Sequence, residues 1–337
     1  MKKLSQKRKL YLDRRARRLS LPHHETRHTS RTRPAPWTRV WLPEEIRLSQ
    51  QVQRTQLLEA ITFLRQYVAL EQKNTVVDFT RTRRVFSDGM LLLYAEIRRL
   101  RAHFPSVRIN CQLPRNSKVA EVLKQIGLLD FLGCRNHIVP SEKDVVHWHF
   151  ATGITVDGEK YESLVGKPFE GALAPPLHEA LYVGMTEAMT NVIHHAYGGK
   201  RDDGLELNES NKRWWMFSTA KDGHLSVVLC DLGVGIPATF PYTHPSVWSY
   251  LRTLGRTKDH NVIEEAVKLG ATRTAQPGRG RGLPQLLDIV TTSPGSRLTI
   301  HSNQGAYFKN GEHTTTFNYR DSILGTLINW RIPLTKS

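Results

Sequence analysis

In the first half of the chain, hydrophobic positions switch between helical and strand spacing. Apolar residues recur every three or four positions over 43–70, where Gln and Arg fill the gaps, and this spacing predicts a helix. Two stretches with period-two alternation, 75–79 and 106–113, predict strands. Each is followed by a helical pattern, at 87–104 and at 117–133. Because strands and helices alternate, we expect an α/β unit in which parallel strands are joined by right-handed crossovers.

Individual residues predict where these helices begin and end. Ser87 stands before the apolar run "DGMLLLYAEI" and is expected to cap the N-terminus of that helix. Gly127 and Gly133 are expected to stop the helix that follows the second strand. We expect a domain boundary between Leu132 and Ser141, where the helical pattern has ended.

The remaining chain contains more strand patterns and one long apolar helix. This helix, "HEALYVGMTEAMTNVIHHAYGG" over 178–199, follows "LAPP", whose prolines favour a first helical turn. Its apolar residues, Leu181, Met185, Ala188 and Val192, define a face that is expected to be buried. Strands are predicted over 144–153, 214–220, 225–233, 296–303 and 326–334.

Positive charge is concentrated at the N-terminus. The chain carries a net charge of +17, and residues 1–40 contain 13 Lys and Arg against two acidic residues, Asp13 and Glu25. Dense charge with few aliphatic residues predicts a largely disordered basic tail over 1–42. Such a tail can bind the phosphates of a nucleic acid, or an acidic membrane surface or protein. A solubilising extension with no dedicated partner is the alternative.

Composition indicates a folded protein with no membrane span. Hydrophobic residues make up 39% of the 337 residues, which is enough for folded cores in two domains. No apolar run approaches the roughly 20 residues of a membrane helix. The N-terminus lacks the apolar stretch of a signal peptide, so a cytoplasmic location is expected. The three cysteines, Cys111, Cys134 and Cys230, fit no zinc spacing, argue against a disulfide framework and are expected to be buried small hydrophobes.

Three polar residues interrupt the long apolar helix at a regular interval. Glu187, Asn191 and His195 lie four positions apart and therefore share one face beside the apolar one. An Asn carbonyl oxygen is a ligand that Mg²⁺ accepts, and a carboxylate one turn away can activate water for attack on a terminal phosphate. The alternative is that these are solvated polar residues of an ordinary helix.

Two glycine-rich segments follow this helix. In "VVLCDLGVGIP" (227–237), a buried strand ends at Asp231, and Gly233 and Gly235 come next. Glycine lets a backbone turn and approach a ligand closely. In "GRGRGLPQLLDIV" (278–290), alternating glycines precede a helix whose free N–H groups suit a polyphosphate. Each segment alone is also compatible with an ordinary turn or linker.

In this order, the three segments resemble the motifs of the GHKL ATPase superfamily, which includes histidine kinases, gyrase-type topoisomerases, heat-shock chaperones and mismatch-repair proteins. "EAMTNVIHHAY" resembles the N box, "DLGVGIP" and "GRGRGL" resemble the two glycine boxes, and Gly325-Thr326 resembles the closing Gly-Thr. The resemblance covers about residues 165–335. It implies a domain over 141–337 with a Bergerat-type α/β sandwich, a mixed sheet with helices on one face. It also implies an ATP lid over 238–277, with ATP and Mg²⁺ as cofactors.

The resemblance implies a role for each matching residue. Asn191 corresponds to the magnesium ligand, Glu187 to the base that activates water, and His195 to the histidine after the N box. Asp231 corresponds to the aspartate that reads adenine, and Thr326 to a threonine near the adenine. The glycines of the nucleotide-binding loops would be Gly233, Gly235, Gly278, Gly280 and Gly282.

The segment upstream resembles a STAS domain, the fold of anti-sigma-factor antagonists, over about residues 50–135 within a domain expected at 43–140. The resemblance is carried by "TVVDFTRTRRVFSDGMLLLYAEIRRL" and by the strand and helix that follow it. In that family a phosphorylatable serine tends to stand just before the glycine of the turn. Here Asp88 has this position and would hold a fixed negative charge, while Ser87 comes one residue earlier. A Ser87 that only caps its helix is the alternative to a phosphorylated Ser87.

Together the resemblances imply an ATP- and Mg²⁺-binding regulatory protein of STAS–GHKL architecture, in which ATP controls the lid and the interaction with a protein partner. Slow ATP hydrolysis, protein-serine kinase activity in the style of anti-sigma factors, and a homodimer are compatible with it. A sensor histidine kinase is disfavoured, because residues 43–72 contain no histidine to accept phosphate. The alternative is a nucleic-acid-associated module that residues 1–40 anchor and in which ATP gates assembly.

Overall fold

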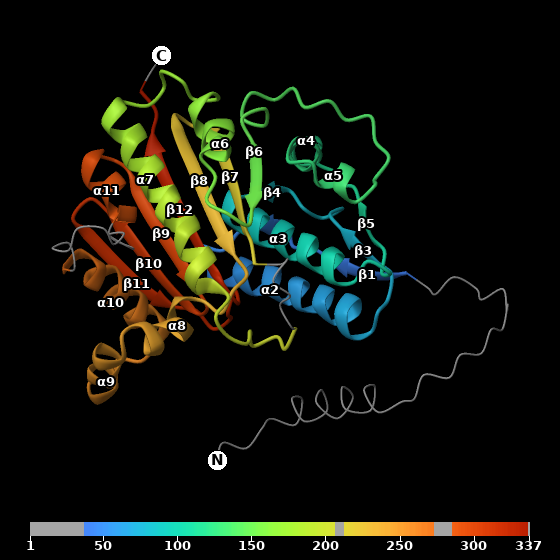
Figure 1. Cartoon of the computed structure of the whole chain (residues 1–337). Helices are drawn as coiled ribbons and strands as arrows, with labels where there is room; N and C mark the ends of the chain where they lie inside the picture. Colours follow the sequence, from blue (N-terminus) through green and yellow to red (C-terminus); the bar gives the residue numbers. More distant parts are fainter. Residues whose placement is uncertain (1–36, 206–211, 273–284, 336–337) are drawn as a thin grey trace, which may run out of the picture. The chain divides into compact units, whose positions relative to one another are not determined.

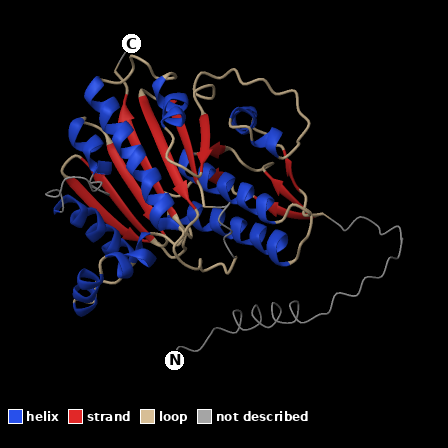
Figure 2. Ribbon diagram, in the orientation of Figure 1, coloured by secondary structure: helices blue, strands red, loops and turns tan. Residues whose placement is uncertain are grey.

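Helices and strands together build an α/β protein, as the sequence predicts (Figures 1 and 2). The computed structural model describes residues 37–205, 212–272 and 285–335. The strands within these ranges form a three-stranded sheet, a seven-stranded sheet and a two-stranded ribbon. No helix in the described ranges is both long and apolar enough to cross a membrane. Most of the predicted basic tail lies outside these ranges.

The smaller sheet is parallel and has the strand order β1–β3–β5. The two predicted strands are present as β3 (Thr75–Asp78) and β5 (Ile109–Gln112), and they pair in parallel as expected. A third strand, β1 (Thr38–Trp41), pairs with the other edge of β3. It falls within residues 1–42, so the expectation of a disordered tail is wrong for these four residues. The helix α3 (Ser87–His103) lies in the connection from β3 to β5. Parallel strands need such a crossover, so the predicted α/β unit is confirmed.

The first predicted helix starts later than its apolar pattern. It is α2 (Gln51–Arg65), which continues into a π-helical turn, η1 (Gln66–Leu70). The preceding residues contain a short strand, β2 (Glu45–Ile46), which pairs with β4 (Arg84–Val85). The prediction missed both short strands because a two-residue strand has no recognisable period.

The next two helices agree with the prediction except for one cap. Phe86 occupies the N-cap position of α3 without any side-chain cap, so the prediction that Ser87 caps this helix is wrong. The third helix is divided into α4 (Ser117–Gln125) and α5 (Leu128–Phe131). Gly127 stands between them with φ +75°, a left-handed conformation that stops a helix.

The larger sheet has the order β11–β10–β9–β12–β8–β7–β6, and every neighbouring pair in it is antiparallel. This corrects the expectation of a mixed sheet. Short turns explain the difference: Asp222 and Gly223, both with positive φ, join β7 to β8, and such turns connect antiparallel strands. The strands are β6 (His149–Gly153), β7 (Trp214–Lys221), β8 (His224–Asp231), β9 (Arg297–Ser302), β10 (Gly305–Asn310), β11 (His313–Asn318) and β12 (Thr326–Pro333).

Within residues 141–337, the helices α7 (Pro175–Asn191), α10 (Asp259–Thr272) and α11 (Gln285–Thr292) pack on one face of the larger sheet, as expected for that range. The helix predicted over 178–199 is α7 with a π-helical end, η3 (Val192–Ala196), and it lies across β8 and β12 in Figure 1. It shares a hydrophobic core with α10 and α11. The shorter helical segments are α6 (Gly158–Tyr161), η2 (Glu162–Gly166), α8 (Ile236–Thr243) and α9 (Pro245–Thr253).

The opposite face of the sheet packs against α2 and α3. Trp215, Phe217, Val228 and Leu327 are buried in one core with residues of these two helices and of the small sheet. The predicted boundary between Leu132 and Ser141 falls in the loop from α5 to β6. The segments on either side of that loop therefore share a hydrophobic core.

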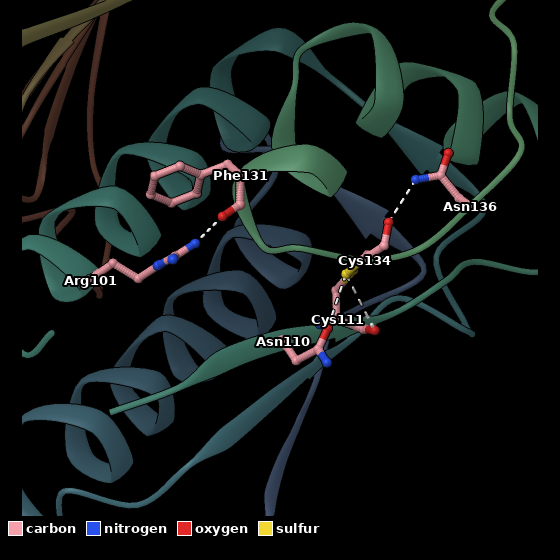
Figure 3. Close-up of a disulfide and its surroundings, with 6 residues drawn as sticks. All are labelled: Arg101, Asn110, Cys111, Phe131, Cys134 and Asn136. Atoms are coloured by element: carbon pink, nitrogen blue, oxygen red, sulfur yellow. Dashed lines mark hydrogen bonds between the residues drawn. A yellow bond between two sulfur atoms is a disulfide. The ribbon is translucent and has the colours of Figure 1, made fainter. Parts of the chain in front are cut away.

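Two cysteines that were expected to be unpaired are joined in a disulfide. Figure 3 shows Cys111, on β5, beside Cys134, which follows α5; their Cα atoms are 6.6 Å apart, within the range for a disulfide. The Asn136 side-chain amide donates a hydrogen bond to the Cys134 carbonyl at 2.8 Å. The prediction missed the pair because residues 23 positions apart in sequence give no sign that they meet in space. Cys230 is free and buried, as predicted.

Candidate functional site

The helix α7 presents Glu187 and Asn191 side by side. Its apolar face is buried as predicted, and Leu181, Met185 and Ala188 are each at most 1% exposed. Glu187 and Asn191 are half-buried, and the Asn191 amide nitrogen donates a hydrogen bond to Glu187 Oε1 at 3.2 Å. This hydrogen bond orients the amide so that its own oxygen points away from the carboxylate. The amide oxygen is the atom that a Mg²⁺ ion would use.

The environment of Glu187 favours the protonated form more than water does. Burial raises the pKa of Glu187, and the Asn191 hydrogen bond and the nearby His195 oppose this shift. His195 lies in the π-helical turn and is exposed, so it is not part of the buried face. A carboxylate with a raised pKa accepts a proton from water more readily, which suits a general base.

Asp231 is buried where β8 ends, opposite Thr326 of β12. Burial raises the pKa of Asp231 to about 6, although two backbone groups favour its charged form. The N–H of Gly233 donates to Asp231 Oδ1 at 2.9 Å, and the N–H of Thr326 donates to the same oxygen at 3.3 Å. The structure therefore brings together three of the predicted residues.

Gly233 joins this carboxylate to the helix that carries Glu187. A Cβ atom at Gly233 would lie 2.0 Å from the carbonyl oxygen of Ala196, so only glycine fits. The next residue, Val234, donates its N–H to the same carbonyl at 2.8 Å. The loop after β8 is thus attached to the end of α7 and its π-helical turn η3.

Contacts within the protein also explain why position 235 is a glycine. Its φ is +83°, and a Cβ atom would lie 2.7 Å from the side-chain amide of Asn303. These contacts give Gly233 and Gly235 a packing role within the protein.

Two residues that the prediction did not single out complete this part of the site. Ser302 Oγ accepts the N–H of Ile236 at 2.8 Å and lies 3.1 Å from Thr326 Oγ1. The Asn303 side chain donates to the Val234 carbonyl at 2.9 Å and accepts the N–H of Gly325 at 3.3 Å. Asn303 has φ +51°, and an Asn at the end of a predicted strand is the only signal in the sequence for this left-handed turn.

A buried cluster of charged residues lies behind Asp231. Glu96 of α3 forms ion pairs with Arg65 of α2, with Arg99 and with Arg201, which follows η3. Burial opposes ionisation, but the three arginines hold the pKa of Glu96 well below its usual range. The charge of Arg201 also lowers the pKa of Asp231. This cluster was not predicted, because Arg65 and Arg201 lie far from Glu96 in the chain and meet it only in the folded protein.

Several predicted residues lie outside the described ranges. These are Gly278, Gly280 and Gly282 and the end of the predicted lid over 238–277, of which α8, α9 and α10 are described. In the described residues no group of three or more His, Cys, Asp or Glu side chains is placed to hold a metal ion. Asn191 remains the single protein ligand predicted for Mg²⁺, an ion that usually keeps several waters.

The chain matches no protein-family model, and the comparison with curated proteins gives no match.

Proposed function

We propose that this protein is an ATP- and Mg²⁺-binding regulatory protein of STAS–GHKL architecture. One observation carries the proposal: the loop that contains Asp231 and Gly233 is attached, through the Val234–Ala196 hydrogen bond, to the helix that presents Glu187 and Asn191. A carboxylate that reads an adenine amine and an amide that holds a metal ion would then belong to one site. In this proposal the large sheet with α7 is the Bergerat-type domain.

Asp231 would recognise adenine by accepting a hydrogen bond from its exocyclic amine. Two backbone N–H groups already orient this carboxylate, so little freedom is lost when a ligand binds. Thr326, opposite Asp231 in the sheet, would lie near the base. Asn191 would hold Mg²⁺, which neutralises charge on the phosphates when it is bound.

Glu187 would act as the base in ATP hydrolysis or in phosphate transfer to a protein serine. Its raised pKa suits this task, and His195 would support it from the adjacent turn. We expect Glu187→Gln to bind ATP as the wild type does and to reduce ADP formation at least about a hundredfold, because general-base catalysis supplies that factor. The matched control is Glu179→Gln, an exposed glutamate on the same helix.

The decisive experiment combines binding and turnover. Calorimetry with ATP and Mg²⁺ tests the nucleotide site, and incubation with γ-labelled ATP, with and without candidate partner proteins, separates released phosphate from phosphoprotein. Absence of adenine-nucleotide binding in the wild type would reject the proposal. Turnover by Glu187→Gln at the wild-type rate would reject only the role of Glu187.

The small sheet supports a STAS-like regulatory part. Asp88, at the start of α3, is buried, and it accepts the N–H groups of Leu48 at 3.2 Å and Gly89 at 2.6 Å. Burial raises the pKa of Asp88, so this position holds a constrained carboxyl rather than a switchable serine. We propose that ATP binding acts on a protein partner through this part.

A further inference from the structure

A cavity of about 680 Å³ lies against the large sheet, at the starts of α3 and α4. This volume is in the range of small-molecule binding sites. Seven basic and three acidic side chains line the cavity, together with aromatic and aliphatic ones such as Phe86, Val122 and Trp148. None of the described residues that we assign to the ATP site is among them.

Strand alternation places this cavity on the sheet face opposite α7. Leu225, Val227 and Leu298 belong to the core beneath α7. Ser226 and Arg297, which alternate with them, line the cavity instead. The cavity is therefore separated from the proposed ATP site by the sheet itself.

Two arginines face each other across the strands that form its floor. Arg297 of β9 and Arg331 of β12 are direct partners in the antiparallel register, and both line the cavity. Like charges directly opposite in a sheet are destabilising. Arg331 contacts His224 Nδ1 at 3.3 Å, and neither arginine has an ion pair with an acidic residue in the described parts of the chain.

The acidic residues of the cavity have other partners or face solvent. Asp144 pairs with Lys118 at 2.7 Å, and Asp88 accepts two backbone N–H groups. Asp222 lies in the exposed turn between β7 and β8. Arg47 forms an ion pair with Glu45 at 3.5 Å, and its buried Nε–H meets no acceptor among the described groups. In the described parts of the chain, Lys221, Arg297 and Arg331 line the cavity without an acidic partner, so it keeps an excess of positive charge.

We infer that this cavity binds a small phosphorylated molecule, with a phosphate group between Arg297 and Arg331. Arginine guanidinium groups bind phosphate oxygens with charge-assisted, often bidentate hydrogen bonds. The apolar wall at Phe86, Val122 and Trp148 would contact the organic part of the ligand. A bound phosphate would also remove the repulsion between the two arginines.

Pyrophosphate, titrated into the full-length protein by calorimetry in EDTA, tests this inference. We expect Arg331→Gln to weaken binding at this site at least about tenfold, because a charge-assisted hydrogen bond is lost, and Arg297→Gln/Arg331→Gln to abolish it. Arg320→Gln, an exposed arginine outside the cavity, should bind as the wild type does. The wild type and the three variants should all bind ATP–Mg²⁺ with the same affinity. A negative result for the cavity can therefore be told apart from a negative result for the proposed ATP site.

Thermal melting supplies a second readout that does not depend on activity. Pyrophosphate should raise the melting temperature of the wild type and leave that of the double variant unchanged, while without pyrophosphate the double variant should melt at or above the wild type. Equal pyrophosphate binding by the wild type and the double variant would overturn the inference. The inference would also be overturned if pyrophosphate did not bind the wild type while a single-stranded RNA bound the wild type more tightly than the double variant. That result would favour a nucleic-acid surface instead.

Discussion

Asp231→Asn should change two properties that depend on this buried carboxyl group: the stability of the protein and its affinity for a nucleotide. Burial raises the pKa of Asp231 from 3.8 to about 6, so the native state holds the proton more tightly than the unfolded chain does. Ionisation of Asp231 therefore lowers the free energy of unfolding. This loss in the free energy of unfolding is absent below about pH 4, grows as the pH rises to about 6, and is constant above that. The difference between a pKa of 3.8 and one of about 6 corresponds to about 3 kcal/mol in the free energy of unfolding.

The asparagine cannot ionise, and its amide oxygen can still accept the N–H groups of Gly233 and Thr326. We therefore expect Asp231→Asn to exceed the wild type in free energy of unfolding by up to about 3 kcal/mol above pH 6, and by much less near pH 4. Its affinity for ADP should fall at least about tenfold, because a charged acceptor is replaced by a neutral group that also donates. Stability and nucleotide binding should change in opposite directions.

Urea titrations between pH 4 and 8 measure the first effect, since urea does not screen charge, and the fluorescence of the buried Trp214, Trp215 and Trp330 reports unfolding. Calorimetry with ADP measures the second. Asp222→Asn makes the same chemical change in an exposed turn and should alter neither quantity. Parallel stability profiles for the wild type and Asp231→Asn would refute the burial argument, and unchanged ADP affinity would refute the adenine-binding role.

Three further changes test other parts of the structure. Gly233→Ala should lower the free energy of unfolding by about 1–3 kcal/mol, because its Cβ would lie 2.0 Å from the Ala196 carbonyl; Gly199→Ala, whose Cβ would meet nothing closer than 3.5 Å, should be nearly neutral in the same urea titration. Glu96→Gln should cost about 3–5 kcal/mol, since it removes one of the two carboxylates, Glu96 and Asp203, that pair with three buried arginines, whereas the exposed Glu59→Gln on α2 should cost little. Deletion of residues 1–36, which stops before β1, should abolish any salt-sensitive binding of single-stranded RNA in a filter assay and leave ATP affinity unchanged. RNA binding that survives the deletion would contradict the tail-anchoring alternative.

Long periodic segments were predictable from the sequence, and short or distant features were not. The apolar face of α7 and the strands β7 and β8, of eight residues each, have enough residues for their period to be visible. β1 has only four residues, and β10 and β11 were not expected at all. The direction of the strands in the large sheet depends on tight turns, which the predicted motif resemblance did not describe.

In the candidate site, too, some residues were predictable from the sequence and others were not. The order of the motifs indicated Asp231 and Thr326, and the sheet register places them opposite each other. Ser302 and Asn303 were missed because their role depends on three hydrogen-bonded loops that meet only in the folded chain. The cluster around Glu96 was missed for a similar reason, since Glu96 and Arg201 are 105 positions apart.

The core shared by α2, α3 and the large sheet means that the two predicted domains cannot be treated as interchangeable modules. A fragment that begins at Ser141 would leave Trp215, Phe217 and Val228 facing water, all of which are buried in the full chain. An apolar patch of this kind drives association with other chains. Recombination that replaces one part would have to preserve the side chains of the other, so the two halves are expected to evolve together and to be inherited as one unit.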